Sequence, residues 1–189
     1  MNAATTLAIE ETALPGLLLV RRPRFTDARG SFEVIHHARD YAAAGLDAVF
    51  VQDNHSVSKR GVVRGLHHQW PMPQGKLVSV VHGAVFDVAV DIREGSPTFG
   101  AYITHELVAG DGLQLWIPPG FAHGFYARVD DTDVIYKATR PYIADHQQRI
   151  RWNDPELGIP WPESDPILSA QDRAATALAT TPGLPALWP

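Results

Sequence analysis

Cysteine is absent from the 189-residue sequence. Its absence excludes disulfide bonds, zinc sites built on thiolates and a cysteine nucleophile. A chain without disulfides fits a reducing compartment, so we expect a cytoplasmic protein.

An excess of basic residues is also missing. The chain has 16 lysines and arginines against 21 aspartates and glutamates, which gives a formal net charge of −5. A general nucleic-acid binder needs a basic surface that neutralises phosphates, and we therefore exclude that class. A few local arginines could still bind a smaller anion.

Long hydrophobic runs are lacking as well. A membrane-spanning helix needs about 20 consecutive apolar residues, whereas the longest early candidate, residues 14–20, contains Pro15 and Gly16. The first residues also lack the basic and apolar regions of a signal peptide. We expect a soluble intracellular protein with no membrane partner.

The composition itself is typical of a globular protein, with 45% hydrophobic and 20% charged residues. This length fits a single domain. A chain of this size can bury a sizeable core without disulfides.

Short strands dominate the pattern along the chain. We expect them at residues 17–20, 31–36, 49–54, 76–81, 84–92, 102–108, 113–117, 124–128 and 133–139. Short helices are expected at residues 38–44 and 171–178, a turn at 25–30, and a loosely held segment over the first dozen residues. His82 and Gly83 form a tight turn between two of the strands.

The strand at 84–92 alternates between two faces. Phe86, Val88, Val90 and Ile92 share one face, and Asp87, Ala89 and Asp91 share the other. Short strands separated by glycine and proline indicate a β-sandwich or barrel. Among these folds we favour an all-β double-sheet jelly roll with short peripheral helices.

Three histidines stand in motifs that could carry chemistry. His67 and His68 are adjacent in RGLHHQ (64–69), so on a strand they point to opposite faces. His123 follows a Pro-Pro-Gly turn in GFAHGF. Imidazoles near the mouth of a barrel suggest either metal ligation or acid–base chemistry.

A metal site is the weaker interpretation of these histidines. Zinc or iron needs three or four converging ligands, and the next acidic residue after His68 is Asp87. A histidine base, by contrast, needs one carboxylate that orients it. Both Asp87 and Asp172 are candidates, and the residues alone do not choose between them.

Other side chains could complete an acid–base site. Lys76 could stabilise an oxyanion, or lie solvated at a strand end. Tyr136 could donate a proton, or simply pack with its hydroxyl at the rim. Arg29 and Arg64 could bind phosphate oxygens, although Arg29 could instead form a surface ion pair with Asp27 or Glu33.

Seven segments together resemble the dTDP-4-dehydrorhamnose 3,5-epimerase family. They are FTDARGSFEV (25–34), FVQDNHSVSKRGVVRGLHHQ (50–69), QGKLVSVVHGAVFDVAVDIREGSPTFG (74–100), LQLWIPPGFAHGF (113–125), YKATRPY (136–142), WNDPELGIPWP (152–162) and LSAQD (168–172). The resemblance implies one cupin-type jelly-roll domain over residues 1–189, with a core at about 17–172 and a C-terminal tail at 173–189. It also implies a homodimer that uses no metal or cofactor.

The resemblance further implies the substrate and the roles of individual residues. The substrate would be a dTDP-4-keto-6-deoxyhexose, with inversion at C3 and C5 through an enolate. His67 matches the base, Asp172 its partner, Tyr136 the proton donor and Lys76 the group near the keto oxygen. The expected substrate-binding residues are Arg29, Glu33, Gln52, Asn54, Arg64, His123 and Tyr142.

One departure from the family pattern concerns the residue after the base, which is usually tyrosine and here is His68. This leaves open an epimerase of one carbon, or a keto-isomerase, of a deoxysugar in secondary metabolism. A sugar-nucleotide-binding jelly roll without catalysis is disfavoured, because simple binding needs no opposed acid and base. A metal-dependent cupin oxygenase is the remaining alternative.

Overall fold

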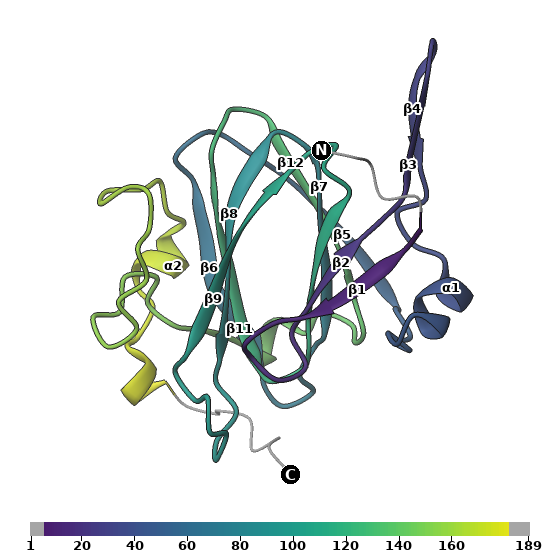
Figure 1. Ribbon diagram of the computed structural model, residues 1–189. Coiled ribbons are helices and arrows are strands. Elements are labelled where there is room, and N and C mark those ends of the chain that lie inside the picture. Colours follow the sequence, from purple (N-terminus) through teal and green to yellow (C-terminus); the bar gives the residue numbers. More distant parts are fainter. Residues whose placement is uncertain (1–5, 182–189) are drawn as a thin grey trace.

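Two antiparallel β-sheets face each other in the computed structural model, which describes residues 6–181 (Figure 1). The first sheet has the order β1 (Ala8–Glu11), β2 (Leu18–Arg21), β10 (Leu113–Ile117), β7 (Lys76–His82), β12 (Thr132–Ala138) and β5 (Gln52–Ser58). The second has the order β13 (Gln147–Arg149), β6 (Val63–Gln69), β11 (Phe121–Ala127), β8 (Ala84–Asp91) and β9 (Tyr102–Val108). The predicted all-β jelly roll is confirmed.

The remaining elements are short. A hairpin of β3 (Arg24–Asp27) and β4 (Gly30–Glu33) projects from the body (Figure 1). The two α-helices are α1 (Ala38–Ala43), as predicted, and α2 (Ala170–Arg173); the 3-10 helices are η1 (Ala144–His146) and η2 (Leu178–Thr180). Within residues 6–181 there is no helix with the length and hydropathy needed to cross a bilayer.

The main core lies between the two sheets, because alternate residues of each strand point inward. The first sheet and its flanking loop contribute Leu14, Leu17, Leu19, Val78, Val80, Leu115, Ile117 and Val134, and the second contributes Val85, Ala89, Leu107, Phe121 and Phe125. Burial of each large aliphatic or aromatic side chain stabilises the fold by about 1.5–3 kcal/mol.

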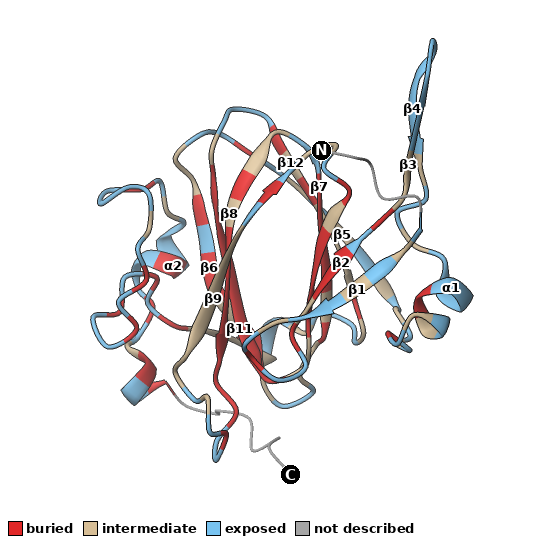
Figure 2. Cartoon of the chain, in the orientation of Figure 1, coloured by how far each residue is buried: buried red, intermediate tan, exposed pale blue. Residues whose placement is uncertain are grey.

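A second core covers the outer face of the second sheet. Val88, Val90 and Ile92 of the β8 region pack there against Leu157 and Leu178 of the C-terminal segment. Figure 2 shows β11 buried along its length and β8 buried except near its start. The predicted alternation of residues 84–92 is therefore correct, and the face with Asp87, Ala89 and Asp91 is the one that points between the sheets.

The turn at Gly83 does not join two paired strands, as a hairpin turn would. β7 pairs with β10 and β12, whereas β8 pairs with β11 and β9, so the turn carries the chain from one sheet to the other. Gly83 has a φ of +76°, and an added Cβ would lie 2.6 Å from the Thr132 hydroxyl oxygen. Turn residues predict where a chain reverses, but the partner of each strand depends on non-local packing.

Some predicted boundaries at the N-terminal end are wrong. Residues 8–11 are not loosely held, because they form β1 and pair with β2, with Ile9 opposite Val20. The segment 25–30 is a turn only at Ala28 and Arg29, because Phe25 to Asp27 belong to β3. These strands lie at the edge of a sheet or in an exposed hairpin, where one buried face is not required and the apolar signal is weak.

Other boundaries moved by a few residues. The strand expected at 49–54 is β5 at 52–58, and the helix expected at 171–178 is the four-residue α2 followed by η2. Leu178 packs in the second core, so packing continues beyond residue 172 into the expected tail. Residues 182–189 of that tail lie outside the described part of the chain.

Candidate active site

A polar cavity of about 280 Å³ is lined by residues of both sheets and of the α2 region. Its lining consists of Ser56, Arg64, His67, Lys76, His123, Phe125, Tyr136, Arg149, Ser169, Gln171 and Asp172. An adjoining space of about 210 Å³ is lined by Asn54, His67, Gln74, Lys76, Tyr136, Tyr142, Gln147 and Arg149. Most of the residues predicted to act on a substrate are therefore brought together.

Strand register explains why these side chains meet. Arg149 of β13, His67 of β6 and His123 of β11 are successive register partners across the second sheet, and thus share its face. In the first sheet, Asn54 is opposite Tyr136, and Gln52 and Lys76 are both opposite Ala138. The cavity is thus lined by His67 and Tyr136 from different sheets.

A close approach of two strands sets the histidine positions. An added Cβ on Gly65 of β6 would lie 2.5 Å from the Cα of Gly124 in β11. Only glycine permits this contact, and each glycine lies next to or near a histidine of the RGLHHQ and GFAHGF motifs. The contact holds His67 and His123 on neighbouring strands.

His67 forms a short hydrogen bond with Asp172, with 2.5 Å between His67 Nε2 and Asp172 Oδ1. Asp172 is buried in α2, where its backbone N–H donates to the Ser169 hydroxyl at the N-cap. An ionised carboxylate can only accept, so Nε2 carries the proton and Nδ1 is the basic nitrogen. Of the two carboxylates that the residues left open, Asp172 is therefore the one in contact with His67.

The environment of this pair favours a neutral imidazole beside an ionised carboxylate. Burial lowers the pKa of His67 below its ordinary value, and this outweighs the opposing effect of Asp172. Burial would raise the pKa of Asp172, but its hydrogen bonds to His67 and Ser169 and the nearby charge of Arg149 more than offset this, so its pKa is lowered. Such a histidine is suited to accept a proton near neutral pH.

Lys76 and Tyr136 face the cavity from neighbouring strands, with Lys76 Nζ 6.0 Å from the centroid of the Tyr136 ring. Burial lowers the pKa of Lys76 to about 8, partly opposed by the negative charge of Asp87. Burial raises the pKa of Tyr136, so the phenol keeps its proton at neutral pH and can donate it. A buried ammonium interacts more strongly with a developing oxyanion than a solvated one.

The second histidine of the cavity has a different partner. His123 Nε2 lies 2.9 Å from Asp87 Oδ2, and both side chains are buried. Asp87 therefore contacts His123 and does not contact His67.

The other predicted binding residues divide into two groups. Arg64 lines the cavity, where it donates to the Ser58 hydroxyl and the Val57 carbonyl. The Gln52 amide donates to Asn54 Oδ1, and Gln52 Oε1 accepts from the backbone N–H of Tyr142.

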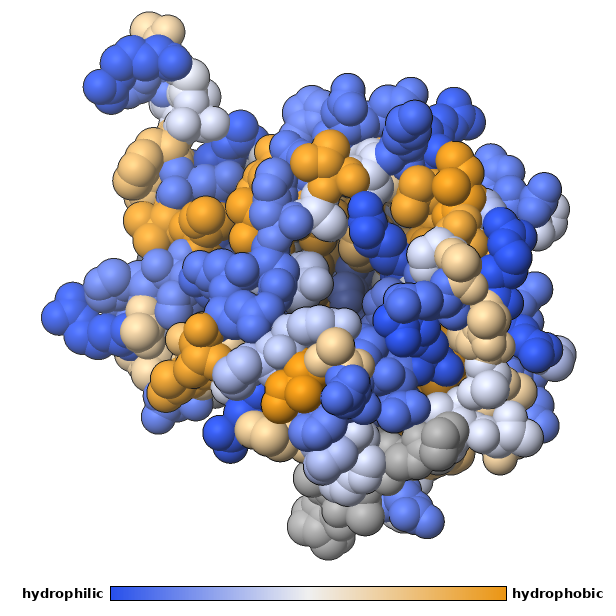
Figure 3. Space-filling view, turned by 180° about the vertical axis from the view of Figure 1, so that it is seen from behind, coloured by the Kyte–Doolittle hydropathy of each residue, from blue (hydrophilic) through white to orange (hydrophobic). Residues whose placement is uncertain are grey.

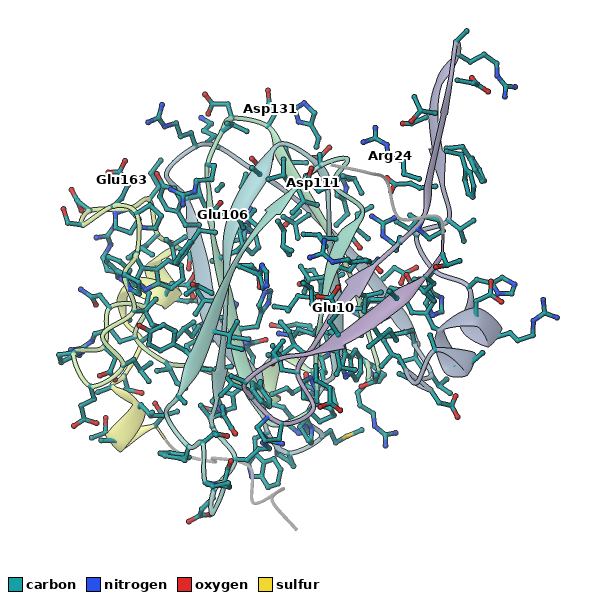
Figure 4. The ribbon with its side chains drawn as sticks, in the orientation of Figure 1. Glu10, Arg24, Glu106, Asp111, Asp131 and Glu163 are labelled. Carbon is teal, nitrogen blue, oxygen red and sulfur yellow. The ribbon has the colours of Figure 1, made fainter. Side chains whose placement is uncertain are left out.

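Three predicted residues, Arg29, Glu33 and Gln52, are not part of the cavity lining, and the first two lie on the β3–β4 hairpin region. Arg29 is at the tip of the hairpin, where its side chain is 90% exposed and bonded to Asp27. Glu33 forms an ion pair with Arg22 at 3.0 Å. Arg24 anchors the base of this hairpin through the Gly110 carbonyl and the Ser31 hydroxyl (Figure 4).

Sequence reasoning missed several lining residues. They are Ser56, Gln74, Phe125, Gln147, Arg149, Ser169 and Gln171. Ser169 and Gln171 lie in the LSAQD segment, and an N-cap serine three residues before Asp172 was a usable signal. Arg149 gave no local signal, because its place depends on the pairing of β13 with β6.

Among residues 6–181, no cluster of three or more histidine, aspartate or glutamate side chains could hold a metal ion.

Comparison with known proteins gives a consistent family. The family model for dTDP-4-dehydrorhamnose 3,5-epimerase matches residues 11–180. The Neisseria gonorrhoeae protein described as dTDP-4-dehydrorhamnose 3,5-epimerase is 49% identical over 172 residues, which are 90% of this chain but 52% of that protein. This chain thus spans about half the length of that relative. The Pseudomonas aeruginosa protein of the same description is 48% identical over 169 residues, which are 88% of this chain and 93% of that protein.

Solved structures show the same similarity. The dTDP-6-deoxy-D-glucose-3,5-epimerase of Legionella pneumophila, in complex with dTDP-4-keto-L-rhamnose, matches with a TM-score of 0.88 and 44% identity over 92% of this chain and 94% of that one. A 3'-monoepimerase of Streptomyces bikiniensis, in complex with dTDP-quinovose, matches with a TM-score of 0.84 and 32% identity over 89% and 87%.

Proposed function

This chain belongs to the dTDP-4-dehydrorhamnose 3,5-epimerase family, and we propose that it converts dTDP-4-dehydro-6-deoxy-D-glucose to dTDP-4-dehydro-L-rhamnose. The observation that carries the proposal is the shared cavity, in which His67 and Tyr136 belong to different sheets and Lys76 lies beside Tyr136. Asp172 contacts His67 from outside the sheet.

The proposed mechanism uses these four residues in turn. C3 and C5 flank the C4 ketone, so removal of either proton gives an enolate with its charge on the C4 oxygen. His67 takes the proton, with Asp172 fixing its tautomer and stabilising the imidazolium. Lys76 stabilises the enolate oxygen. Tyr136 returns a proton to the opposite face of the same carbon, which inverts it. His67 then releases its extra proton to water and the Tyr136 phenolate takes one up, so that the cycle has no net change in atoms or electrons.

Arg64 and Tyr142 are assigned to the nucleotide part of the substrate, and His123 to the sugar. Arg64 is exposed at the edge of the cavity, where its guanidinium can bind the pyrophosphate. Tyr142 is 49% exposed beside Gln52 and Asn54, and is assigned to the base. His123 is placed on the sugar side, next to His67.

We propose a homodimer to account for the two predicted binding residues of the hairpin, which lie away from the cavity of their own chain. The hairpin that carries Arg29 and Glu33 projects from the body with a hydrophilic tip and apolar residues near its base (Figure 3). Its Phe25 and Phe32 are 57% and 66% exposed, which is costly for a monomer. We assign the hairpin to the second copy's cavity, and sedimentation equilibrium would measure the dimer directly.

The test of the activity is product analysis in heavy water. The enzyme is incubated with dTDP-4-dehydro-6-deoxy-D-glucose in D₂O, and NMR follows deuterium at each carbon and the configuration of the product. Deuterium at both C3 and C5 with inversion of both supports the proposal. Deuterium and inversion at one carbon favour the alternative, a single-centre epimerase, for which the similarity to the Streptomyces bikiniensis 3'-monoepimerase is the specific observation. No exchange at either carbon contradicts both.

A further inference from the structure

Four side chains line both parts of the cavity, and one of them has no role in the proposed mechanism. The four are His67, Lys76, Tyr136 and Arg149. Arg149 matched no motif in the sequence, and it occupies the last position of β13, directly opposite His67 of β6.

Arg149 contacts the same carboxylate oxygen as the proposed base. Its Nε lies 3.7 Å from Asp172 Oδ1, the atom that accepts from His67 Nε2 at 2.5 Å. Its Nη2 donates to Gln171 Oε1 at 2.7 Å. The guanidinium therefore connects the edge of the second sheet to α2, the helix of only four residues that carries Asp172.

We propose that Arg149 is a positioning residue, which holds the ionised Asp172 carboxylate in place against His67 Nε2 while its own positive charge disfavours protonation of His67. This inference rests on the proposed function, because it concerns the base of that reaction. The side chain of Arg149 is 24% exposed and that of Asp172 is 5% exposed, so this ion pair is only partly screened by water.

Charges on several elements act on His67, and Arg149 is one of two cations that disfavour its protonated form. Burial and the charges of Lys76 and Arg149 lower the pKa of His67, and Asp172 raises it. The titratable or charged groups around it are Asp172 of α2, Arg149 of β13, Lys76 of β7, Tyr136 of β12, His123 of β11 and Arg64 of its own strand. Loss of the cation at position 149 therefore raises the pKa of His67.

The experiment compares Arg149→Met and Arg149→Lys with the wild type. The matched control is Arg151→Met, an exposed arginine two residues along the same segment. The imidazole of His67 is titrated by NMR in the free protein and assigned with His67→Asn. We expect Arg149→Met to raise the pKa of His67, Arg149→Lys to stay closer to the wild type, and Arg151→Met to leave it unchanged.

Kinetics provide the second measurement. For dTDP-4-dehydro-6-deoxy-D-glucose, Arg149→Met should lower kcat/KM by about 10- to 100-fold, the range typical of a lost supporting contact, and should move the acid limb of the pH profile to higher pH. Arg149→Lys should recover part of both effects.

Three outcomes would overturn the inference. One is an unchanged His67 titration in a folded Arg149→Met protein. Another is a higher KM with an unmoved acid limb, which would assign Arg149 to substrate binding. The third applies if Arg149→Met does not fold, in which case Arg149→Gln replaces it as the uncharged variant. The inference is then overturned if the pKa of His67 is displaced as far in Arg149→Lys as in Arg149→Gln. A wild-type protein that fails to turn over this substrate contradicts the proposed function, while the NMR titration still decides whether Arg149 controls His67.

Discussion

Two histidines on adjacent strands of the second sheet each contact an aspartate. His67 of β6 and His123 of β11 are register partners, and each has a carboxylate oxygen within 3 Å of its Nε2, at 2.5 Å from Asp172 and 2.9 Å from Asp87. The residue types and the contact are the same in both. What differs is where the carboxylate comes from and how far the imidazole is exposed in the cavity that both histidines line.

His67 is 28% exposed in the cavity, and Asp172 comes from the irregular C-terminal segment. His123 is 7% exposed and Asp87 is fully buried, on the strand next to it. The more exposed His67 can reach a substrate proton, whereas the nearly buried His123 lines the same cavity and is held by Asp87 of the neighbouring strand. Of the two imidazoles, the one with an open side toward the cavity is therefore the candidate base.

The largest expected effect is a loss of turnover when His67, the proposed base, is replaced. Replacement of His67 by asparagine removes the general base, and kcat should fall by about 10²- to 10⁴-fold. Binding of dTDP, measured by calorimetry, should persist because the nucleotide-binding groups are intact. His37→Asn, at an exposed histidine of the surface, is the control. Full turnover by His67→Asn would end the assignment of His67 as the base.

Strand periodicity predicted much of what surrounds these histidines. The alternation in 84–92 placed Asp87 and Ala89 on one face, and the adjacent His67 and His68 on opposite faces. The structure agrees, since His67 lines the cavity and His68 does not. These are local properties of an extended chain, so they could be read from neighbouring residues.

Pairing between distant segments could not be predicted in the same way. The local pattern left Asp87 and Asp172 equal as partners of His67, and only the resemblance favoured Asp172. Arg149 was missed because a three-residue strand must pair with β6 before it enters the cavity. Arg29 was assigned to substrate binding by the resemblance, whereas in this chain it lies at an exposed hairpin tip and forms the ion pair with Asp27 that the residues alone had left open.

A smaller effect is expected for the two aspartates: loss of Asp172 should lower kcat, whereas loss of Asp87 should lower the free energy of unfolding. Asp172→Ala should lower kcat by about 10- to 100-fold, as expected for a lost orienting partner, with little loss of stability because water can reach His67. Asp87→Ala leaves a buried imidazole N–H without its acceptor, and should cost about 1–3 kcal/mol of unfolding free energy. Chemical denaturation and initial rates measure the two quantities on the same proteins.

The opposite pattern in the two variants would contradict these assignments of Asp172 and Asp87. A large loss of stability in Asp172→Ala with normal kcat, together with a stable Asp87→Ala protein, would make Asp172 the structural link. Asp53→Ala, at an exposed carboxylate of β5, is the control for both measurements.

The smallest expected effect is a shift of the pH profile of kcat/KM, because the negative charge of Asp87 raises the pKa of Lys76. The rate needs neutral His67, and burial lowers the pKa of His67, so kcat/KM should fall as pH drops through a value below the ordinary 6.5. It also needs the Lys76 ammonium, whose pKa is about 8, so activity should be lost as pH rises through that region. In the free enzyme the Tyr136 phenol stays protonated between these two limbs, because its pKa is raised.

Asp87→Asn tests which pair controls which limb of this profile. Asparagine retains an acceptor for His123 but removes the anion that raises the pKa of Lys76. The basic limb should therefore move to lower pH, while the acid limb, which reports His67 and Asp172, should stay in place. A basic limb that does not move would show that Asp87 does not act on Lys76. A moved acid limb would show that the two His–Asp pairs titrate as one coupled unit.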